Sequence, residues 1–160
     1  MSSFDDAFTA LIGNEGGYSN NPRDPGGETM WGITARVARA NGYAGAMKAL
    51  PLQTAKAIAK REYWDPLCLD QFDARIAFQM FDANYNGGPT VRWAQQASGV
   101  PVDGKISPRT IDAIRATDPV EFCLRFLAYR LKYLTGLRAW PTFGRGWSGR
   151  IASNMLKGGS

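Results

Sequence analysis

The chain has 160 residues, of which 44% are hydrophobic and 12% aromatic, and its formal net charge at pH 7 is +5. This length fits one domain of one or two lobes, and the apolar fraction suits a packed core and excludes a disordered chain. The sequence contains no histidine, which excludes histidine-based zinc hydrolases and Ser-His or Cys-His catalysis and leaves carboxylates as the acid–base groups.

The first predicted element is an amphipathic helix, which Ser3 would cap and Gly13 would end. Its apolar face repeats at helical spacing over Phe4, Phe8, Leu11 and Ile12. Glu15 would then emerge half buried at the edge of the core. An apolar wall raises the pKa of a carboxyl group, which suits it to donate a proton.

The next segment is rich in glycine, proline and asparagine, and we expect a small hairpin or two within Gly17–Ile33. Asp24 follows Glu15 by nine positions (24 − 15 = 9) and lies in a solvated turn, where it should stay ionised. Two carboxyl groups in contrasting environments suit the cleavage of a glycosidic bond. By spacing alone, however, a solvated helix end followed by an ordinary turn is the favoured interpretation.

Two aromatic residues and two further carboxylates near these positions leave alternatives open. Tyr18 and Trp31 are candidates for contact with a sugar, although either residue could instead belong to the core or to the hairpin. Glu28 rivals Asp24 as the second carboxylate, and Asp82 is a further possibility.

The remainder of the chain predicts helices. The segment after an Asp73 cap is apolar on nearly every side, as expected of a buried central helix that is broken at Gly87-Gly88-Pro89. The other expected helices follow a Thr34 cap, start at Pro51, span 91–97, follow Ser107 and Asp118 caps, and include 147–155. We therefore expect a mainly α fold, a helical bundle around a central helix, with a small β-hairpin lobe that carries part of the active site.

Residues 15–34 closely resemble the signature of glycoside hydrolase family 108, which comprises N-acetylmuramidases of the lysozyme superfamily, commonly phage endolysins. The matching positions are Glu15-Gly16-Gly17-Tyr18, Asn21-Pro22, Asp24, Gly26-Gly27, Thr29 and Gly32-Ile33-Thr34. The resemblance implies an α+β lysozyme-like fold and a catalytic Glu15. More distant phage-type lysozymes have a Glu, Asp, Thr triad that would map onto Glu15, Asp24 and Thr29, although the Asp-to-Thr spacing is one residue shorter here.

The resemblance extends to later segments. Phe81–Gly88 resembles a second block on a central helix that borders the cleft, so Asn84, Tyr85 and Asn86 are candidate substrate-binding residues. The two asparagines are equally typical of a helix cap. The segment from Trp93 to Thr110 resembles a predicted peptidoglycan-binding region. We therefore expect a catalytic portion over 1–88, a C-terminal helical lobe over 89–156 packed on the same domain, and a flexible tail over 157–160.

The resulting hypothesis is a peptidoglycan hydrolase that cleaves the β-1,4 bond between N-acetylmuramic acid and N-acetylglucosamine. Glu15 would be the general acid, while Asp24, helped by Thr29, would position water or stabilise the cationic transition state. The alternatives are a lytic transglycosylase, which needs only the glutamate, and a non-catalytic wall-binding or secretion accessory protein.

The positive net charge suits an acidic polymer, and the sequence contains no nucleic-acid motif and no apolar run near eighteen residues. We therefore expect bacterial peptidoglycan as the partner, no nucleic acid, no stable membrane insertion, no metal or cofactor, and a monomer. The acidic N-terminus predicts no signal peptide. The resemblance implies synthesis in a host cytoplasm and action on the wall after release through a separate pore.

Overall fold

The computed structural model describes residues 4–15, 17–23 and 26–160, with the backbone alone at 13–15. The fold is mainly α with one small antiparallel sheet. The chain divides into two compact units, an N-terminal unit up to Pro66 and a C-terminal unit, Leu67–Ser160. Among the described residues, no helix combines the length and the apolar character needed to cross a membrane.

The helices of the N-terminal unit are α1 (Phe4–Glu15), α2 (Ala35–Ala40) and α3 (Leu52–Ala59). Shorter helical turns follow at Met47–Ala49 (η1), Lys60–Trp64 (η2, a π-helix) and Asp65–Leu67 (η3), the last of which ends on the first residue of the C-terminal unit. The C-terminal unit contains η4 (Leu69–Gln71), α4 (Ala74–Tyr85), α5 (Thr90–Ser98), α6 (Pro108–Ala116), α7 (Pro119–Thr135) and α8 (Trp140–Gly158).

Helix α1 presents the apolar face that its spacing predicts. Phe4, Phe8 and Leu11 are all buried, and the Phe4 ring packs edge-on against Trp64 at 5.4 Å between centroids. The predicted stop at Gly13 is wrong, because the helix continues to Glu15. A glycine inside a helix costs only about 1 kcal/mol, which does not end a helix whose other residues favour it. Glu15 therefore lies in the last turn of α1 and not beyond it.

The predicted hairpin is confirmed in the N-terminal unit. Strand β1 (Thr29–Met30) pairs antiparallel with β2 (Ile33–Thr34), in the register Thr29 with Thr34 and Met30 with Ile33. Trp31 and Gly32 form the two-residue turn with φ values of 55° and 75°, as a type I′ turn requires. A bridge between Ser19 and Thr29 extends the ladder on the other side of β1.

Helix caps explain where several of the other helices begin. The Thr34 side chain accepts a hydrogen bond from the Val37 backbone N–H, which caps α2 as predicted. Asp73, Ser107 and Asp118 cap α4, α6 and α7 in the same way. Pro51 is the N-cap residue of α3 and not its first helical residue, so that prediction was one position early. Helix α8 spans Trp140–Gly158, so it includes the expected residues 147–155 and begins seven residues before them.

Helix α4 is the buried helix that its composition predicts. Its Ile76, Met80 and Phe81 side chains are at most 2% exposed, and Phe78 is 7% exposed. The compact units divide at Pro66–Leu67, so α4 belongs with the helices that follow it. The expected boundary at residue 88 divides a catalytic portion from a C-terminal lobe, and it does not coincide with the boundary between the compact units. This division by function stays a prediction.

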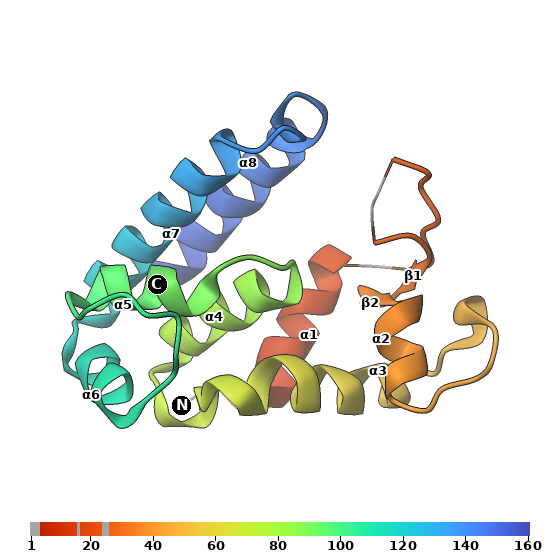
Figure 1. The fold of residues 1–160 in the computed structure, drawn as a ribbon, viewed down its shortest axis with the longest axis horizontal. Coiled ribbons are helices and arrows are strands. Elements are labelled where there is room, and N and C mark those ends of the chain that lie inside the picture. Colours follow the sequence, from red (N-terminus) through yellow and green to blue (C-terminus); the bar gives the residue numbers. More distant parts are fainter. Residues whose placement is uncertain (1–3, 16, 24–25) are drawn as a thin grey trace. The chain divides into compact units, whose positions relative to one another are not determined.

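A polar cluster lies inside this apolar C-terminal unit. Asp82 of α4 is fully buried, and its Oδ2 accepts hydrogen bonds from Arg130 Nη1 of α7 at 2.7 Å and from Asn154 Nδ2 of α8 at 2.8 Å. Arg150 of α8 also approaches, with Nη1 3.6 Å from Asp82 Oδ1. Helices α7 and α8 lie side by side (Figure 1), and both are joined to α4 through this one carboxylate.

We expect Asp82→Asn to lower the free energy of unfolding by about 3 kcal/mol, because removal of one charge leaves the buried Arg130 guanidinium without its ion-pair partner. Urea denaturation followed by circular dichroism measures this change. The control is Asp112→Asn, at an exposed position of α6, which should change stability by less than about 0.5 kcal/mol. A similarly small loss for Asp82→Asn would contradict the structural role of this carboxylate.

Candidate active site

The segment that carries the predicted catalytic residues lies within the N-terminal unit, between the end of α1 and β2. Glu15 is placed there by the α1 backbone, while its side chain and the whole of Asp24 lie outside the described residues. Thr29 opens β1. The structure therefore positions one end of the predicted catalytic set through α1 and the other through the hairpin.

The register of the hairpin determines which way the Thr29 side chain points. Residues paired across strands share one face of a sheet, so Thr29, Thr34 and Ser19 lie on one face, opposite Met30 and Ile33. Ile33 is fully buried, so its face is the core face. The Thr29 hydroxyl is thus directed away from the core, and among the described residues it has no hydrogen-bond partner.

Glu28, the rival second carboxylate, is already engaged. The Tyr18 hydroxyl donates a hydrogen bond of 2.8 Å to Glu28 Oε1. That hydrogen bond is the main cause of a raised pKa for the Tyr18 hydroxyl. Lys48 Nζ lies over the Tyr18 ring, 4.9 Å from its centroid, in a cation–π contact. Tyr18, which is 36% exposed, thus links the segment after α1 to the residue that precedes β1.

Trp31, a predicted sugar-binding residue, has a structural role in the hairpin. Its backbone φ of 55° is uncommon for a residue with a side chain. Its indole Nε1–H donates a hydrogen bond of 3.0 Å to the Leu50 carbonyl, which fixes the turn against the loop before α3. The half-buried ring remains partly accessible, so its contact with substrate stays a prediction.

The second candidate block lies at the end of α4 in the C-terminal unit. Tyr85 is only 7% exposed and packs edge-on against Phe81, so it is part of the core. Asn86 is exposed and is the C-cap residue of α4, where its Nδ2 donates to the Asp82 carbonyl at 2.8 Å. The capping interpretation is therefore confirmed for Asn86, while Asn84, two residues earlier, is partly exposed.

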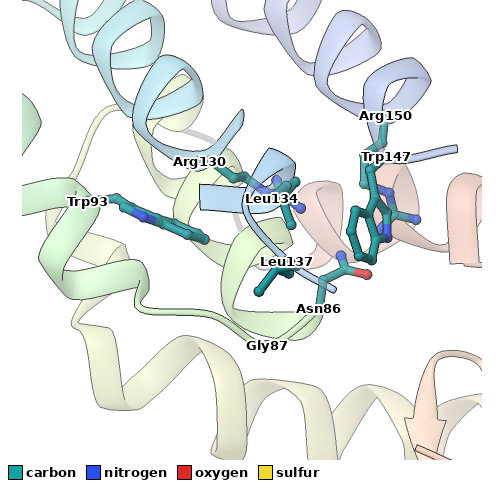
Figure 2. A pocket seen from close by; sticks show the side chains of 8 residues that line it. All are labelled: Asn86, Gly87, Trp93, Arg130, Leu134, Leu137, Trp147 and Arg150. Carbon is teal, nitrogen blue, oxygen red and sulfur yellow. The ribbon is translucent and has the colours of Figure 1, made fainter. Parts of the chain in front are cut away.

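A hollow of about 140 Å³ adjoins this helix end (Figure 2). Its lining includes Asn86, Trp93, Leu134, Leu137, Trp147 and Arg150. Trp147 and Arg150 come from α8 and were not among the predicted site residues. Spacing in the sequence could not have singled them out, because they are more than 60 positions from Asn86 (147 − 86 = 61).

Asp82 is excluded as the second catalytic carboxylate. It is fully buried, and Arg130 and Asn154 occupy one of its oxygens. A carboxylate that acts on substrate must reach either the sugar or the attacking water. Asp82 instead holds helices together.

The segment that resembles a peptidoglycan-binding region, 93–110, includes the end of α5, the loop that follows it and the start of α6. The buried Gln95 side chain accepts hydrogen bonds from the backbone N–H groups of Asp103 and Gly104, at 3.1 and 2.9 Å. Its Nε2 donates to Asp103 Oδ1 at 2.7 Å, and this bond is the main cause of a lowered Asp103 pKa. Gln95, Asp103 and Gly104 therefore have a structural role in this loop, which accounts for their presence without a ligand.

Comparison with known proteins gives two findings. A family model described as glycosyl hydrolase 108 matches residues 8–88, just over half of the chain. Among solved structures, the chain is similar to the "Structure of Brucella abortus SagA", with 30% sequence identity and a TM-score of 0.88 over 97% of this chain and 92% of that one. The search of curated proteins gave no match.

The Tyr18–Glu28 hydrogen bond predicts a specific pH dependence. Because the bond holds the proton on Tyr18, its contribution to stability is present below the ordinary tyrosine pKa of 10.0 and is lost as the pH rises through the raised pKa. We expect Glu28→Gln to lower the Tyr18 pKa towards 10.0. A titration by NMR with tyrosine labelled at the ring carbon that bears the hydroxyl measures this, with Tyr18→Phe to assign the resonance. A Tyr18 pKa that does not respond to Glu28→Gln would show that the bond is absent in solution.

Proposed function

The chain belongs to glycosyl hydrolase family 108, whose members act on peptidoglycan, and we propose that it is an N-acetylmuramidase of the endolysin type. It would hydrolyse the β-1,4 bond between N-acetylmuramic acid and N-acetylglucosamine. The observation that carries the proposal is the family match over residues 8–88, because this range contains Glu15, Asp24 and Thr29, the residues that the chemistry requires.

Glu15 is proposed as the general acid, which protonates the oxygen of the leaving sugar. Its place in the last turn of α1 supports this role. The C-terminal end of a helix carries a partial negative charge, which disfavours a carboxylate and raises the pKa of a carboxyl group there. A glutamic acid that stays protonated near neutral pH is the donor that glycoside cleavage needs.

Asp24 is proposed as the second carboxylate, and Thr29 as its partner. The hydrogen bond from Tyr18 and the nearby Lys48 ammonium favour a structural role for Glu28, which leaves Asp24 as the acidic residue of the segment for this task. Asp24 would position the attacking water or stabilise positive charge on the sugar ring in the transition state. The Thr29 hydroxyl, directed away from the core, would hold the same water.

The aromatic and amide side chains would bind the glycan. Tyr18 and Trp31 present partly exposed rings in the N-terminal unit, and flat rings pack against the apolar faces of sugars. In the C-terminal unit, Asn84 and Asn86 would bind an N-acetyl group or a sugar hydroxyl, while Tyr85 supports them from the core.

The biological setting that we propose is lysis of a bacterial host. The enzyme would be made in the host cytoplasm and would reach the wall through a separately encoded pore. The C-terminal residues 89–156 would bind the wall. The net charge of +5 supports attraction to an anionic envelope, in a manner that weakens with salt.

We expect Glu15→Gln to fold normally and to lose about 10²- to 10⁴-fold of the rate at which peptidoglycan is cleaved, because the amide cannot donate the proton. The measurement is the release of reducing ends from purified sacculi, with circular dichroism and the unfolding midpoint as checks on folding. Near-wild-type activity of Glu15→Gln would refute the assignment.

Two further substitutions in the same assay separate the rival carboxylates. Asp24→Asn should lose activity, although less than Glu15→Gln if its role is electrostatic. Glu28→Gln keeps the size of the side chain and should retain most activity. The reverse order, with Glu28→Gln the more impaired, would transfer the role of the second carboxylate to Glu28.

A further inference from the structure

An open groove of about 500 Å³ lies on the C-terminal unit, where α5 packs against α7. Its walls include Arg92, Gln96, Val102, Tyr129, Lys132 and Tyr133, and Trp93 also lines it. None of these residues belongs to the catalytic set proposed above. Tyr129, Lys132 and Tyr133 share one face of α7, because residues three and four positions apart are neighbours on a helix.

The groove carries positive charge. The exposed Arg92 and Lys132 supply two cations, and no Asp or Glu is among the residues that line it. Within the described part of the chain, neither cation has an ion-pair partner. Two solvated cations that form no salt bridge attract an anionic ligand and bind it at little cost, because no existing ion pair must be broken.

The groove also offers apolar surface to solvent. Tyr133 is 43% and Val102 is 42% exposed, which is high for large hydrophobic residues. The Tyr133 ring is supported from below by Trp93, at 5.3 Å between centroids and with an interplanar angle of 69°. A ring that is fixed in this way loses little conformational freedom when it packs against a ligand.

Hydrogen bonds fix the loop that forms one wall of the groove. On the α5 side, the Gln95 hydrogen bonds to Asp103 and Gly104 fix the loop that carries Val102. A Cβ atom at Gly104 would lie 3.2 Å from Arg92 Nε, so the guanidinium lies close over this glycine. The loop therefore leaves room for the Arg92 side chain and helps to orient it.

We propose that this groove is an accessory binding site for peptide-bearing peptidoglycan. Arg92 and Lys132 would bind free carboxylates of the stem peptides, while Tyr129 and Tyr133 would pack against the sugar rings. The identity of this ligand rests on the proposed function, since the family acts on peptidoglycan. Nucleic acid fits less well, because two cations are few for a phosphate backbone, which usually meets a stripe of basic residues.

The test is co-sedimentation of the full chain with sacculi, in a Glu15→Gln background so that the ligand is not digested. The groove variant Arg92→Gln/Lys132→Gln is compared with Arg109→Gln/Arg115→Gln, which removes the same charge from exposed positions of α6. We expect the groove variant to bind intact sacculi about tenfold more weakly, the sum of two exposed ionic contacts, while the α6 variant binds like the parent chain.

A second ligand identifies the group that is bound. Intact sacculi whose stem-peptide carboxylates have been converted to neutral amides, by carbodiimide and ethanolamine, stay insoluble and lack those charges, so the groove variant and its parent should bind them equally. An equal loss for the groove and α6 variants would reduce the effect to net charge and overturn the proposal. So would an equal loss on amidated sacculi, no loss on unmodified sacculi, or tighter binding to single-stranded DNA than to sacculi.

A second variant and a separate measurement of activity complete the test. Because Arg92 also contacts Gly104, Lys132→Glu serves as a second variant at an exposed side chain, with unfolding midpoints as the check on folding. Charge reversal should weaken binding to intact sacculi more than Lys132→Gln does. Binding is measured without turnover, so a wild-type chain that bound sacculi through the groove but released no reducing ends would refute the proposed catalysis alone.

Discussion

The buried Asp82 carboxylate determines how the C-terminal unit is assembled. Its hydrogen bonds with Arg130 and Asn154 join α4 to α7 and α8. Because Asp82 is fully buried, an unpaired charge there would be strongly destabilising. The same residue also supports the end of α4, because the Asn86 side chain donates to its backbone carbonyl. The hollow of Figure 2, lined by Asn86, Arg130 and Arg150, is formed around this cluster.

The need to pair the buried Asp82 carboxylate explains why Phe81–Gly88 forms a distinct block in the sequence. A buried acid in an apolar helix is tolerated only when its partners arrive from elsewhere in the fold. Asp82 therefore fixes the register of α7 and α8 against α4. The groove between α5 and α7 depends on the same arrangement, since α7 supplies Tyr129, Lys132 and Tyr133.

Features that depend on neighbours in sequence could be predicted, and features that depend on distant partners could not. The caps at Thr34, Asp73 and Asp118 were predicted because a cap bonds within three residues of itself. The role of Asp82 was missed because its partners lie 48 and 72 positions away. The Gly13 stop was wrong because a helix-ending residue is only a local preference, which the buried face of α1 outweighs.

In the candidate site, too, the contacts between distant residues could not be predicted from the sequence. The resemblance to the family is confirmed over residues 8–88, and the mainly α fold with one small hairpin agrees with the lysozyme-like expectation. The engagement of Glu28 by Tyr18 and the anchoring of Trp31 to Leu50 could not be read from spacing, since each depends on how the chain folds back on itself. The catalytic roles of Glu15 and Asp24 stay predictions, which rest on chemistry and on the resemblance to the family.

The central claim is that this chain hydrolyses the muramic acid side of the glycan linkage, and product analysis tests it most directly. Peptidoglycan digested in heavy-oxygen water, reduced with borohydride and analysed by mass spectrometry should yield N-acetylmuramitol, the reduced form of N-acetylmuramic acid, at the new ends. Each of these ends should have gained one heavy oxygen from the attacking water. Anhydromuramic ends without the label would show a transglycosylase, and reduced glucosamine ends would show cleavage of the other bond; either result would contradict the account.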